Sequence, residues 1–289
     1  HMVRCLESLR ASGVRAPVVY NWHNIESELM FRYAETVRSP ARRSYASLTA
    51  RKLQRMESEI LRDALGHVVC SERERENLSR IAPQARIAVI ENGVDCDAFA
   101  PEARGSGGTP KSIVFVGSMD YFPNIEGVTW FAREIWPKVR ERLPDLEFMI
   151  VGARPTDAVL ALKELPGVVV TGTVDSVKPY YRNALAAVAP LKTGGGTRLK
   201  ILEAMAAGAP VISTALGAEG LAIQPGADYL LAGDSAHEEW VRHLTDLASK
   251  PELRGELIKR GLRTVRSRYD WRSLGKQLVE TYHGWLERP

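Results

Sequence analysis

Three consecutive glycines, Gly194 to Gly196, stand directly before two cationic residues, Arg198 and Lys200, and an acidic residue, Glu203. Glycine triplets weaken regular elements, so the stretch "LKTGGGTRLKILEAMAAG" is expected to contain a turn. The apolar run before the glycines predicts a strand, and the pattern after them predicts a helix. We therefore place the glycines at a strand-to-helix turn.

A strand-to-helix turn of this kind can hold an anion. Free backbone N–H groups and the helix dipole attract negative charge, and the missing side chains let a phosphate approach the backbone closely. Arg198 and Lys200 fall in the first helical turn, where the dipole disfavours cations unless a bound anion offsets the cost. Glu203 lies three residues after Lys200 on a similar helix face and can accept two hydrogen bonds from a ribose diol. Together these residues predict a diphosphate-plus-ribose pocket.

A plainer interpretation is a tight turn with a surface arginine and lysine, in which Glu203 pairs with Lys200. The stretch is not a P-loop, which needs GK[ST]. It is not the GxGxxG dinucleotide fingerprint either, because Leu199 occupies the third glycine position. The residues themselves indicate an anion site with a nucleotide as the favoured ligand, and the plainer interpretation stays open.

The elements that must position this turn follow an α/β pattern from Lys111 onward. Apolar runs without alternation are typical of strands buried on both faces of a parallel sheet. Such runs occur at residues 112–117, 146–152, 167–172, 186–191, 210–214 and 228–233. Helical patterns such as 124–143 and 197–208 lie between them. This alternation predicts a doubly wound domain whose ligands bind at the carboxyl ends of the strands.

The remaining segments suggest a second, smaller unit. Apolar runs at 16–21, 66–71 and 86–92, with a long helical insert, make about half of an ordinary α/β domain. A Gly-, Ser- and Pro-rich stretch is typical of a linker. We predict the following division: a partial N-terminal domain at 1–101, a linker at 102–110, a C-terminal domain at 111–268 and a closing amphipathic helix at 269–289.

Composition excludes several classes of protein. The 289 residues are 45% hydrophobic and 26% charged, which is typical of a globular protein, and no apolar run approaches the roughly 20 residues of a membrane span. Cys5, Cys70 and Cys96 lie far apart without CxxC spacing, which argues against a disulfide framework or a zinc site and suits a reducing cytosol.

Part of the net charge of +4 is concentrated between Arg32 and Arg62. The favoured interpretation of this stretch is a solvated helix face. The alternative is attraction to an anionic membrane surface or to a phosphate-bearing acceptor. Nucleic acid is not expected as a partner, because the aromatic interleaving and the motifs of nucleic-acid binding are missing.

Several motifs in the same order resemble one family. The segment 195–214 resembles the donor-site motif of the group 1 (family 4) glycosyltransferases of the GT-B fold. "VFVGSMDYFPNIEGVTWF" resembles the opening of their C-terminal domain, "VIENGVDCDAF" their interdomain stretch and "NWHNIESEL" their acceptor-side loop. The resemblance implies a fold of two Rossmann-like doubly wound domains, of which the N-terminal one is incomplete here, and a closing helix that crosses back toward the N-terminal domain.

The resemblance also implies roles for single residues. Arg198 and Lys200 would contact the diphosphate, Glu203 would bind the ribose, and His23 matches a family histidine near the reacting sugar. His23, Arg198 and Lys200 are therefore the candidate catalytic residues. The candidate substrate-binding residues are Gly117, Ser118, Gly172, Thr173, Val174, Gly194, Gly195, Gly196, Thr197, Leu199 and Glu203.

The chemistry implied by the family is sugar transfer from a nucleotide-diphosphate sugar, such as a UDP-sugar, with retention of configuration. No metal and no cofactor are expected. The acceptor would be a saccharide or a lipid-linked molecule in bacterial polysaccharide assembly, in the cytoplasm or at the inner face of the cell membrane with peripheral membrane contact. A catalytically silent nucleotide-sugar-binding fragment and a GT-B sugar-nucleotide epimerase are the alternatives.

The sequence departs from the family pattern at the donor site and at its start. Many members carry a glutamate at the position of Gly195, and an arginine and a lysine where "GSMDYFPN" offers Met119 and Asn124. The phosphate contacts are therefore expected to depend mainly on Arg198 and Lys200. Family members also begin with strands that are missing here, which indicates a truncated or fragmentary N-terminal domain. Uncovered strand edges predict a homodimer through that domain.

Overall fold

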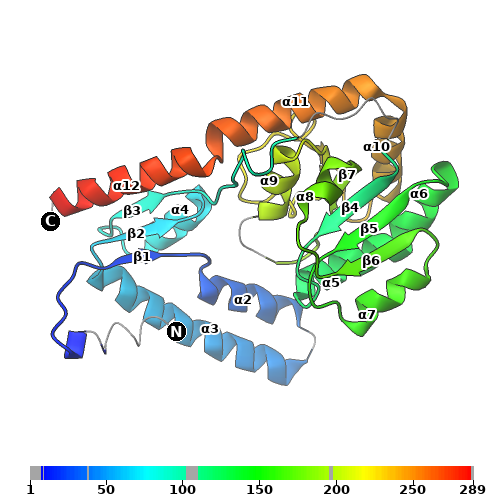
Figure 1. Cartoon of the computed structure of the whole chain (residues 1–289). Coiled ribbons are helices and arrows are strands. Elements are labelled where there is room, and N and C mark those ends of the chain that lie inside the picture. Colours follow the sequence, from blue (N-terminus) through cyan, green and yellow to red (C-terminus); the bar gives the residue numbers. More distant parts are fainter. Residues whose placement is uncertain (1–7, 9, 38, 102–109, 195–197, 288–289) are drawn as a thin grey trace. The chain divides into compact units, whose positions relative to one another are not determined.

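The computed structural model describes residues 8, 10–37, 39–101, 110–194 and 198–287 (Figure 1). The chain divides into two compact units. One contains residues 1–91 and 275–289, and the other contains residues 92–274. The predicted linker lies outside the described residues except for Pro110. Residues 92–101 and 269–274 belong to the second unit, where a bridge joins Val94 to Asp270 and Arg272 pairs with Asp97 at 2.5 Å.

The larger unit is built on a six-stranded sheet in the order β6-β5-β4-β7-β8-β9, in which every pair is parallel. Its strands are β4 Ser112–Val116, β5 Glu147–Val151, β6 Val168–Gly172, β7 Ala184–Ala189, β8 Val211–Ser213 and β9 Leu230–Leu231. Five of the six predicted apolar runs contain one of these strands, and the run 186–191 overlaps β7, which begins two residues earlier. Strands covered on both faces need continuous apolar sequence.

Helices cover both faces of this sheet (Figure 1). They are α5 Phe122–Trp130, α6 Trp136–Arg142, α7 Asp157–Leu160, α8 Lys178–Arg182, α9 Leu199–Ala206, α10 His237–Ser249 and α11 Pro251–Arg268. Successive residues of β4 alternate between two cores. Ile113 and Phe115 pack with α5, α6 and α10, whereas Val114 and Val116 pack with α9 and the end of α11. The expected doubly wound α/β architecture is confirmed.

The helix predicted over 124–143 is interrupted. A π-helical segment, η1 Phe131–Ile135, separates α5 from α6. Pro137 follows it at the start of α6, and a proline has no N–H for the helix and crowds the carbonyl four residues earlier. A short 3-10 turn, η2 Ala161–Glu164, similarly follows α7.

The smaller unit holds a three-stranded parallel sheet in the order β1-β2-β3. Its strands are β1 Val19–Asn21, β2 Gly66–Val69 and β3 Ile87–Val89, and its helices are α2 Glu26–Thr36, α3 Pro40–Asp63 and α4 Glu72–Ile81. A small core of Trp22, Ile25, Leu61, Val69, Leu78 and Ala82 lies beside the sheet. The last helix, α12 Trp271–Glu287, starts in the larger unit, and its Trp285 packs on Gly66 of β2.

Candidate functional site

The larger sheet has one topological switch point, between β4 and β7. The chain leaves β4 toward β5 on one side, and it returns to add β7 on the other side of β4. In open α/β sheets ligands bind in the crevice that opens at the carboxyl ends of two such strands. Gly117 and Ser118 follow β4, and Gly194 follows β7. The candidate glycines therefore lie where the topology predicts a ligand.

Asn124 organises the turn after β4. Its side chain is buried, and its amide Nδ2 donates a hydrogen bond of 2.9 Å to the carbonyl of Ser118. A Cβ atom at Gly117 would lie 2.6 Å from that nitrogen and 3.1 Å from Lys200 Nζ. A glycine is therefore needed at position 117, because a side chain there would displace both Asn124 and Lys200.

Lys200 extends from α9 into this turn. Its ammonium donates a hydrogen bond of 2.7 Å to Asn124 Oδ1 and lies 4.1 Å from the centre of the Phe115 ring. Burial, followed by the neighbouring charge of Arg198, lowers the pKa of Lys200 to about 7, although the nearby Glu203 acts in the opposite direction. The ammonium thus has an amide oxygen and an aromatic face as neighbours, and neither carries a full negative charge.

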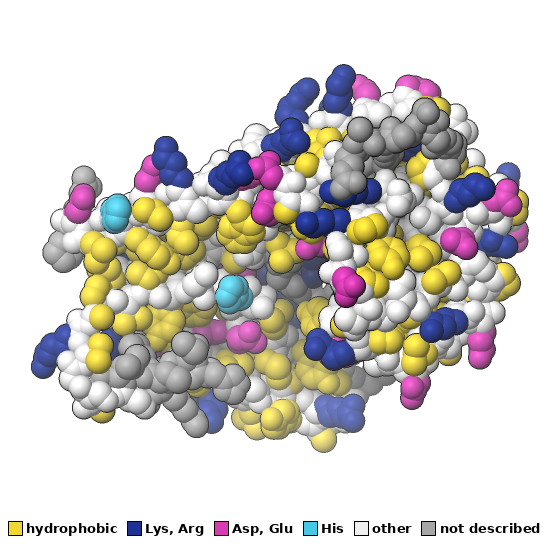
Figure 2. Space-filling view, viewed as in Figure 1, with side chains coloured by type: hydrophobic (Ala, Val, Ile, Leu, Met, Phe, Trp, Pro, Cys, Tyr) yellow, Lys and Arg dark blue, Asp and Glu magenta, His cyan; other side chains and the backbone are white. Residues whose placement is uncertain are grey.

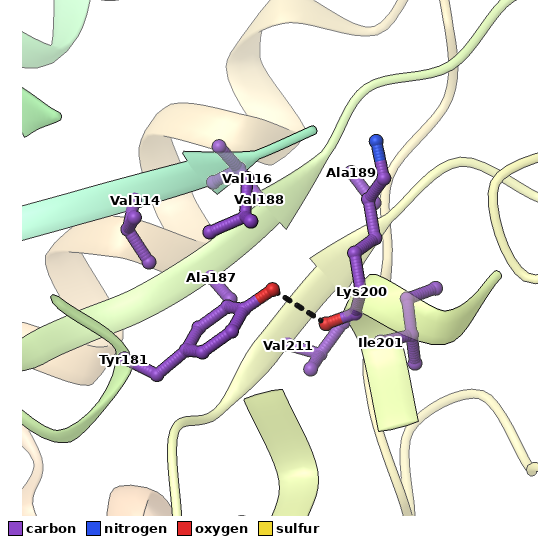
Figure 3. Close-up of a pocket in the computed structure, with 9 residues that line it drawn as sticks. All are labelled: Val114, Val116, Tyr181, Ala187, Val188, Ala189, Lys200, Ile201 and Val211. Carbon is purple, nitrogen blue, oxygen red and sulfur yellow. Dashed lines mark hydrogen bonds between the residues drawn. The ribbon is translucent and has the colours of Figure 1, made fainter. Parts of the chain in front are cut away.

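Glu203 is held one turn further along α9 by Tyr181 of α8. The buried Tyr181 hydroxyl lies 3.3 Å from Glu203 Oε2 and 3.2 Å from the carbonyl oxygen of Lys200. Figure 3 shows the Tyr181 hydroxyl pointing at the main chain of Lys200, while the Lys200 side chain extends away from the ring. Burial raises the pKa of Glu203, whereas the Tyr181 hydrogen bond and the Lys200 charge oppose that rise. Tyr181 therefore fixes where the carboxylate lies.

Arg198 differs from the sequence prediction in its position. It is the N-cap residue of α9 and not part of the first turn, and its side chain is buried. Its guanidinium donates to the carbonyl of Gly194 at 3.1 Å and to that of Leu216 at 3.4 Å. These acceptors are neutral, so Arg198 stabilises the turn after β7 and still contributes a positive charge beside Lys200.

The other predicted residues fall into three places. Gly194 has a φ of 101°, which favours glycine, and Leu199 is 42% exposed, while Gly195, Gly196 and Thr197 lie outside the described residues. The turn Gly172-Thr173-Val174 ends the edge strand β6. Gly172 has a φ of 73° there, and Val174 packs against the cluster that includes Tyr181. His23 is exposed and follows β1 in the smaller unit.

The sequence did not identify Tyr181, Phe115 or Arg154 as residues of this edge. Arg154 follows β5 with a φ of 54°, pairs with Asp120 at 2.5 Å and donates 2.9 Å to Ser118 Oγ. Only a cation in the turn after a predicted strand could have signalled Arg154. Tyr181 and Phe115 look like ordinary core residues in the sequence.

Across the described ranges, His, Cys, Asp and Glu side chains do not gather in groups of three or more that could hold a metal ion. Within the same ranges, none of the helices is both long enough and apolar enough to cross a membrane.

Sequence comparison relates this chain to known proteins. Residues 110–250 match the sequence model of the family described as Glycosyl transferases group 1. A phosphatidyl-myo-inositol mannosyltransferase of Mycobacterium tuberculosis (strain ATCC 25618 / H37Rv) is 30% identical over 203 residues, which cover 67% of this chain and 53% of that protein. A D-inositol 3-phosphate glycosyltransferase of Corynebacterium urealyticum is 27% identical over 226 residues, covering 71% and 53%. The chain spans about half the length of the curated relatives it matches.

Solved structures of other proteins share the fold of this chain. Sucrose-phosphate synthase from Thermosynechococcus elongatus superposes with a TM-score of 0.73 at 18% identity, covering 99% of this chain and 72% of that one. HepE from Anabaena, solved with UDP and glucose, superposes with a TM-score of 0.70 at 16% identity, covering 96% and 74%. The predicted GT-B type of α/β fold is confirmed by these likenesses.

Proposed function

Because the chain belongs to the group 1 glycosyl transferases, we propose that it moves a sugar from a nucleoside-diphosphate sugar to a saccharide or lipid-linked acceptor. One observation carries the donor half of this proposal. The Lys200 ammonium lies at the switch point of the larger sheet against the neutral amide of Asn124. A half-buried ammonium beside a neutral acceptor lacks a counter-charge, and an anionic ligand would supply one and keep the ammonium protonated.

Each side chain of the site then has a part in binding the donor. Lys200 and Arg198 neutralise the diphosphate with charge-assisted hydrogen bonds, and Gly117 and Gly194 let the phosphates approach the main chain. Glu203, oriented by Tyr181, accepts hydrogen bonds from the ribose hydroxyls. Because the diphosphate and the ribose are both held by fixed groups, the sugar is positioned at the mouth of the crevice.

The same cations promote departure of the nucleotide. When the bond between the anomeric carbon and the phosphate oxygen breaks, negative charge grows on the diphosphate, and fixed cations in a half-buried site stabilise that charge. We propose transfer with retention. The acceptor oxygen forms its bond to the anomeric carbon on the face that the diphosphate leaves, and the acceptor proton passes to the departing phosphate oxygen. No metal is required in this scheme.

The nature of donor and acceptor is supported by the relatives. HepE was solved with UDP and glucose, so a uridine diphosphate sugar is the first donor to test. One relative is named for D-inositol 3-phosphate and another for phosphatidyl-myo-inositol, which favours a polar, phosphate-bearing acceptor that is free or attached to a lipid. We propose that transfer takes place in the cytoplasm, at the inner face of the membrane.

The test is a calorimetric titration of the protein with UDP, GDP and ADP, with and without EDTA. The Glu203→Ala variant is compared with Glu141→Ala, which removes an exposed glutamate of the same unit. We expect one nucleotide to bind in either buffer, to weaken by about thirtyfold or more in Glu203→Ala because bonds to a charged group are lost, and to bind normally in Glu141→Ala. Absence of binding by all three nucleotides would overturn the proposal.

A further inference from the structure

Helix α11 carries cations that the helix itself does not favour. From Leu257 onward it contains several arginines and a lysine but no Asp or Glu, and Figure 2 shows such side chains along the upper edge of the view, where Figure 1 places α11. The helix dipole favours the two arginines of the last turn, but it does not reach Lys259, Arg260 and Arg263. Arg263 is three positions from Arg260 and four from Lys259, a spacing at which like charges repel one another on one helix face. An anion among them would relieve that repulsion.

These three cations line an open pocket of about 420 Å³ in the larger unit. The pocket lies between α11 and the segment 224–228, which precedes β9. All three side chains are exposed, and in the part of the chain that the structure describes none of them has a carboxylate partner. The volume is in the range of pockets that hold small molecules. The pocket therefore presents these charges to a small ligand.

The Asp228 carboxylate fixes the wall opposite the helix. Its Oδ2 accepts a hydrogen bond of 2.8 Å from the main-chain N–H of Gln224, and its Oδ1 accepts one of 2.9 Å from the Thr264 hydroxyl of α11. On the inner face of α11, Gly261 packs on α9, where an added Cβ atom would lie 3.2 Å from the Met205 side chain. The pocket is therefore formed before a ligand binds, and the Asp228 carboxylate is already engaged.

A second carboxylate restricts the kind of anion that fits. Glu256 lines the pocket with an exposed side chain, three positions before Lys259 and four before Arg260 on the same helix face. It would repel a ligand that is anionic over its whole surface, whereas it can accept hydrogen bonds from hydroxyl groups. The Gln224 amide, also at the pocket, can both donate and accept. The lining therefore fits a ligand with one anionic end and several hydroxyl groups.

We propose that this pocket binds a phosphorylated monosaccharide. The phosphate lies among Lys259, Arg260 and Arg263, which supply charge-assisted hydrogen bonds. The sugar hydroxyls meet Glu256 and Gln224. None of these residues belongs to the candidate donor site at the switch point, so the pocket is a second site with a ligand of its own.

Other anionic partners match the lining less well. An extended polyanion such as a nucleic acid would bring further phosphates against Glu256. A flat anionic surface would reach the ends of the cations but not the inside of the pocket. Inorganic phosphate alone would leave Glu256 and Gln224 without hydroxyl partners. A sugar phosphate provides the anionic end and the hydroxyl groups in one small molecule.

The test is a calorimetric titration at low ionic strength with three probes, namely glucose 6-phosphate, inorganic phosphate and glucose. The unchanged protein is compared with Arg260→Gln/Arg263→Gln and with Glu256→Ala. The matched control is Arg133→Gln/Arg242→Gln, which removes two exposed arginines elsewhere in the same unit. Thermal unfolding without ligand establishes that each variant is folded.

We expect glucose 6-phosphate to bind more tightly than inorganic phosphate, and glucose not to bind. Arg260→Gln/Arg263→Gln should lose about a hundredfold or more in affinity for glucose 6-phosphate, because each lost bond to a charged group accounts for about tenfold. Glu256→Ala should weaken glucose 6-phosphate by about fivefold, yet inorganic phosphate should bind equally or more tightly, because a nearby negative charge is removed. The control pair should bind as the unchanged protein does.

Lys200→Met separates this pocket from the donor site, and it should bind glucose 6-phosphate normally. A loss in that variant would place the phosphate in the donor site and overturn the proposal. Equal losses in the control pair, or no binding of glucose 6-phosphate, would also overturn it. Inorganic phosphate that binds as tightly as glucose 6-phosphate, with no effect of Glu256→Ala, would overturn the assignment to a sugar. These outcomes do not depend on whether UDP binds.

Discussion

Two charged side chains, one in each unit, have different kinds of neighbour: Glu57 is buried and Lys200 is half-buried. Glu57 of α3 and Lys200 of α9 are both shifted mainly by burial, which raises the pKa of Glu57 and lowers that of Lys200. Glu57 receives two hydrogen bonds from Ser27, a partner in the adjacent helix. Lys200 faces the neutral Asn124 oxygen and the Phe115 ring.

We interpret this difference as one between a structural charge and a charge that serves the proposed ligand. The donors of Ser27 satisfy the Glu57 carboxylate inside the α2–α3 pair, so its role ends with folding. Within the described residues Lys200 donates to the neutral Asn124 amide in place of the water it has lost, which costs stability when no ligand is bound. The proposed anionic ligand would offset that cost in free energy, because it would place a negative charge beside the ammonium.

The largest effect is expected from Lys200→Met. Nucleotide affinity should fall by about a hundredfold or more, because the diphosphate loses a buried cation, whereas the free energy of unfolding should stay equal or rise. Calorimetric titration and urea unfolding measure the two quantities. Lys163→Met, at an exposed lysine elsewhere in the same unit, is the matched control and should leave both unchanged. Lower stability in Lys200→Met would place Lys200 among the structural charges.

Glu57→Leu should give the reverse pattern. Ser27 would lose the acceptor of both its hydrogen bonds, and unpaired buried donors cost about 2–3 kcal/mol of unfolding free energy. UDP affinity should not change. Glu59→Leu, at an exposed position on the same helix, is the control. Equal destabilisation by both variants would mean that hydrophobic surface, and not the lost bonds, is responsible.

Nucleotide binding should also depend on pH. A diphosphate binds the protonated form of Lys200, so the nucleotide raises its pKa, and affinity should fall as pH rises above 7, by at most about tenfold per unit. In the empty protein the unfolded state holds this proton up to about pH 10.5 and the folded state releases it near 7. Stability should therefore rise with pH across that window. Titration in two buffers of different ionisation enthalpy measures proton uptake, which Lys200→Met should abolish.

The smallest effect is expected from Asn124→Ala. Loss of one hydrogen bond to the ammonium should weaken nucleotide binding by about fivefold, because Lys200 remains but is less well oriented. Titrating this variant beside Lys200→Met separates the effect of orienting the Lys200 ammonium from the effect of its charge. A loss as large as that of Lys200→Met would mean that the Asn124 amide contacts the nucleotide directly.

Much of the fold followed from local pattern. Every apolar run predicted as a strand overlaps one, and the helices between the runs were expected. The π-helical interruption at Phe131–Ile135 was not expected, although Pro137 stood in the predicted helix. A proline indicates that a helix is disturbed, but the packing around it decides whether the helix ends, kinks or widens.

The sequence by itself determined the α/β class and the approximate strand positions and led to the prediction of an anionic ligand, because periodicity and residue type act over a few neighbouring positions. Only the tertiary structure decided that Asn124 meets Lys200 across 76 positions of the chain and that Tyr181 meets Glu203 across 22. It likewise decided that Tyr45 and Leu48 face outward among the cations of α3. The physical reason is the same in each case, since burial and distant contacts depend on how separate elements pack together.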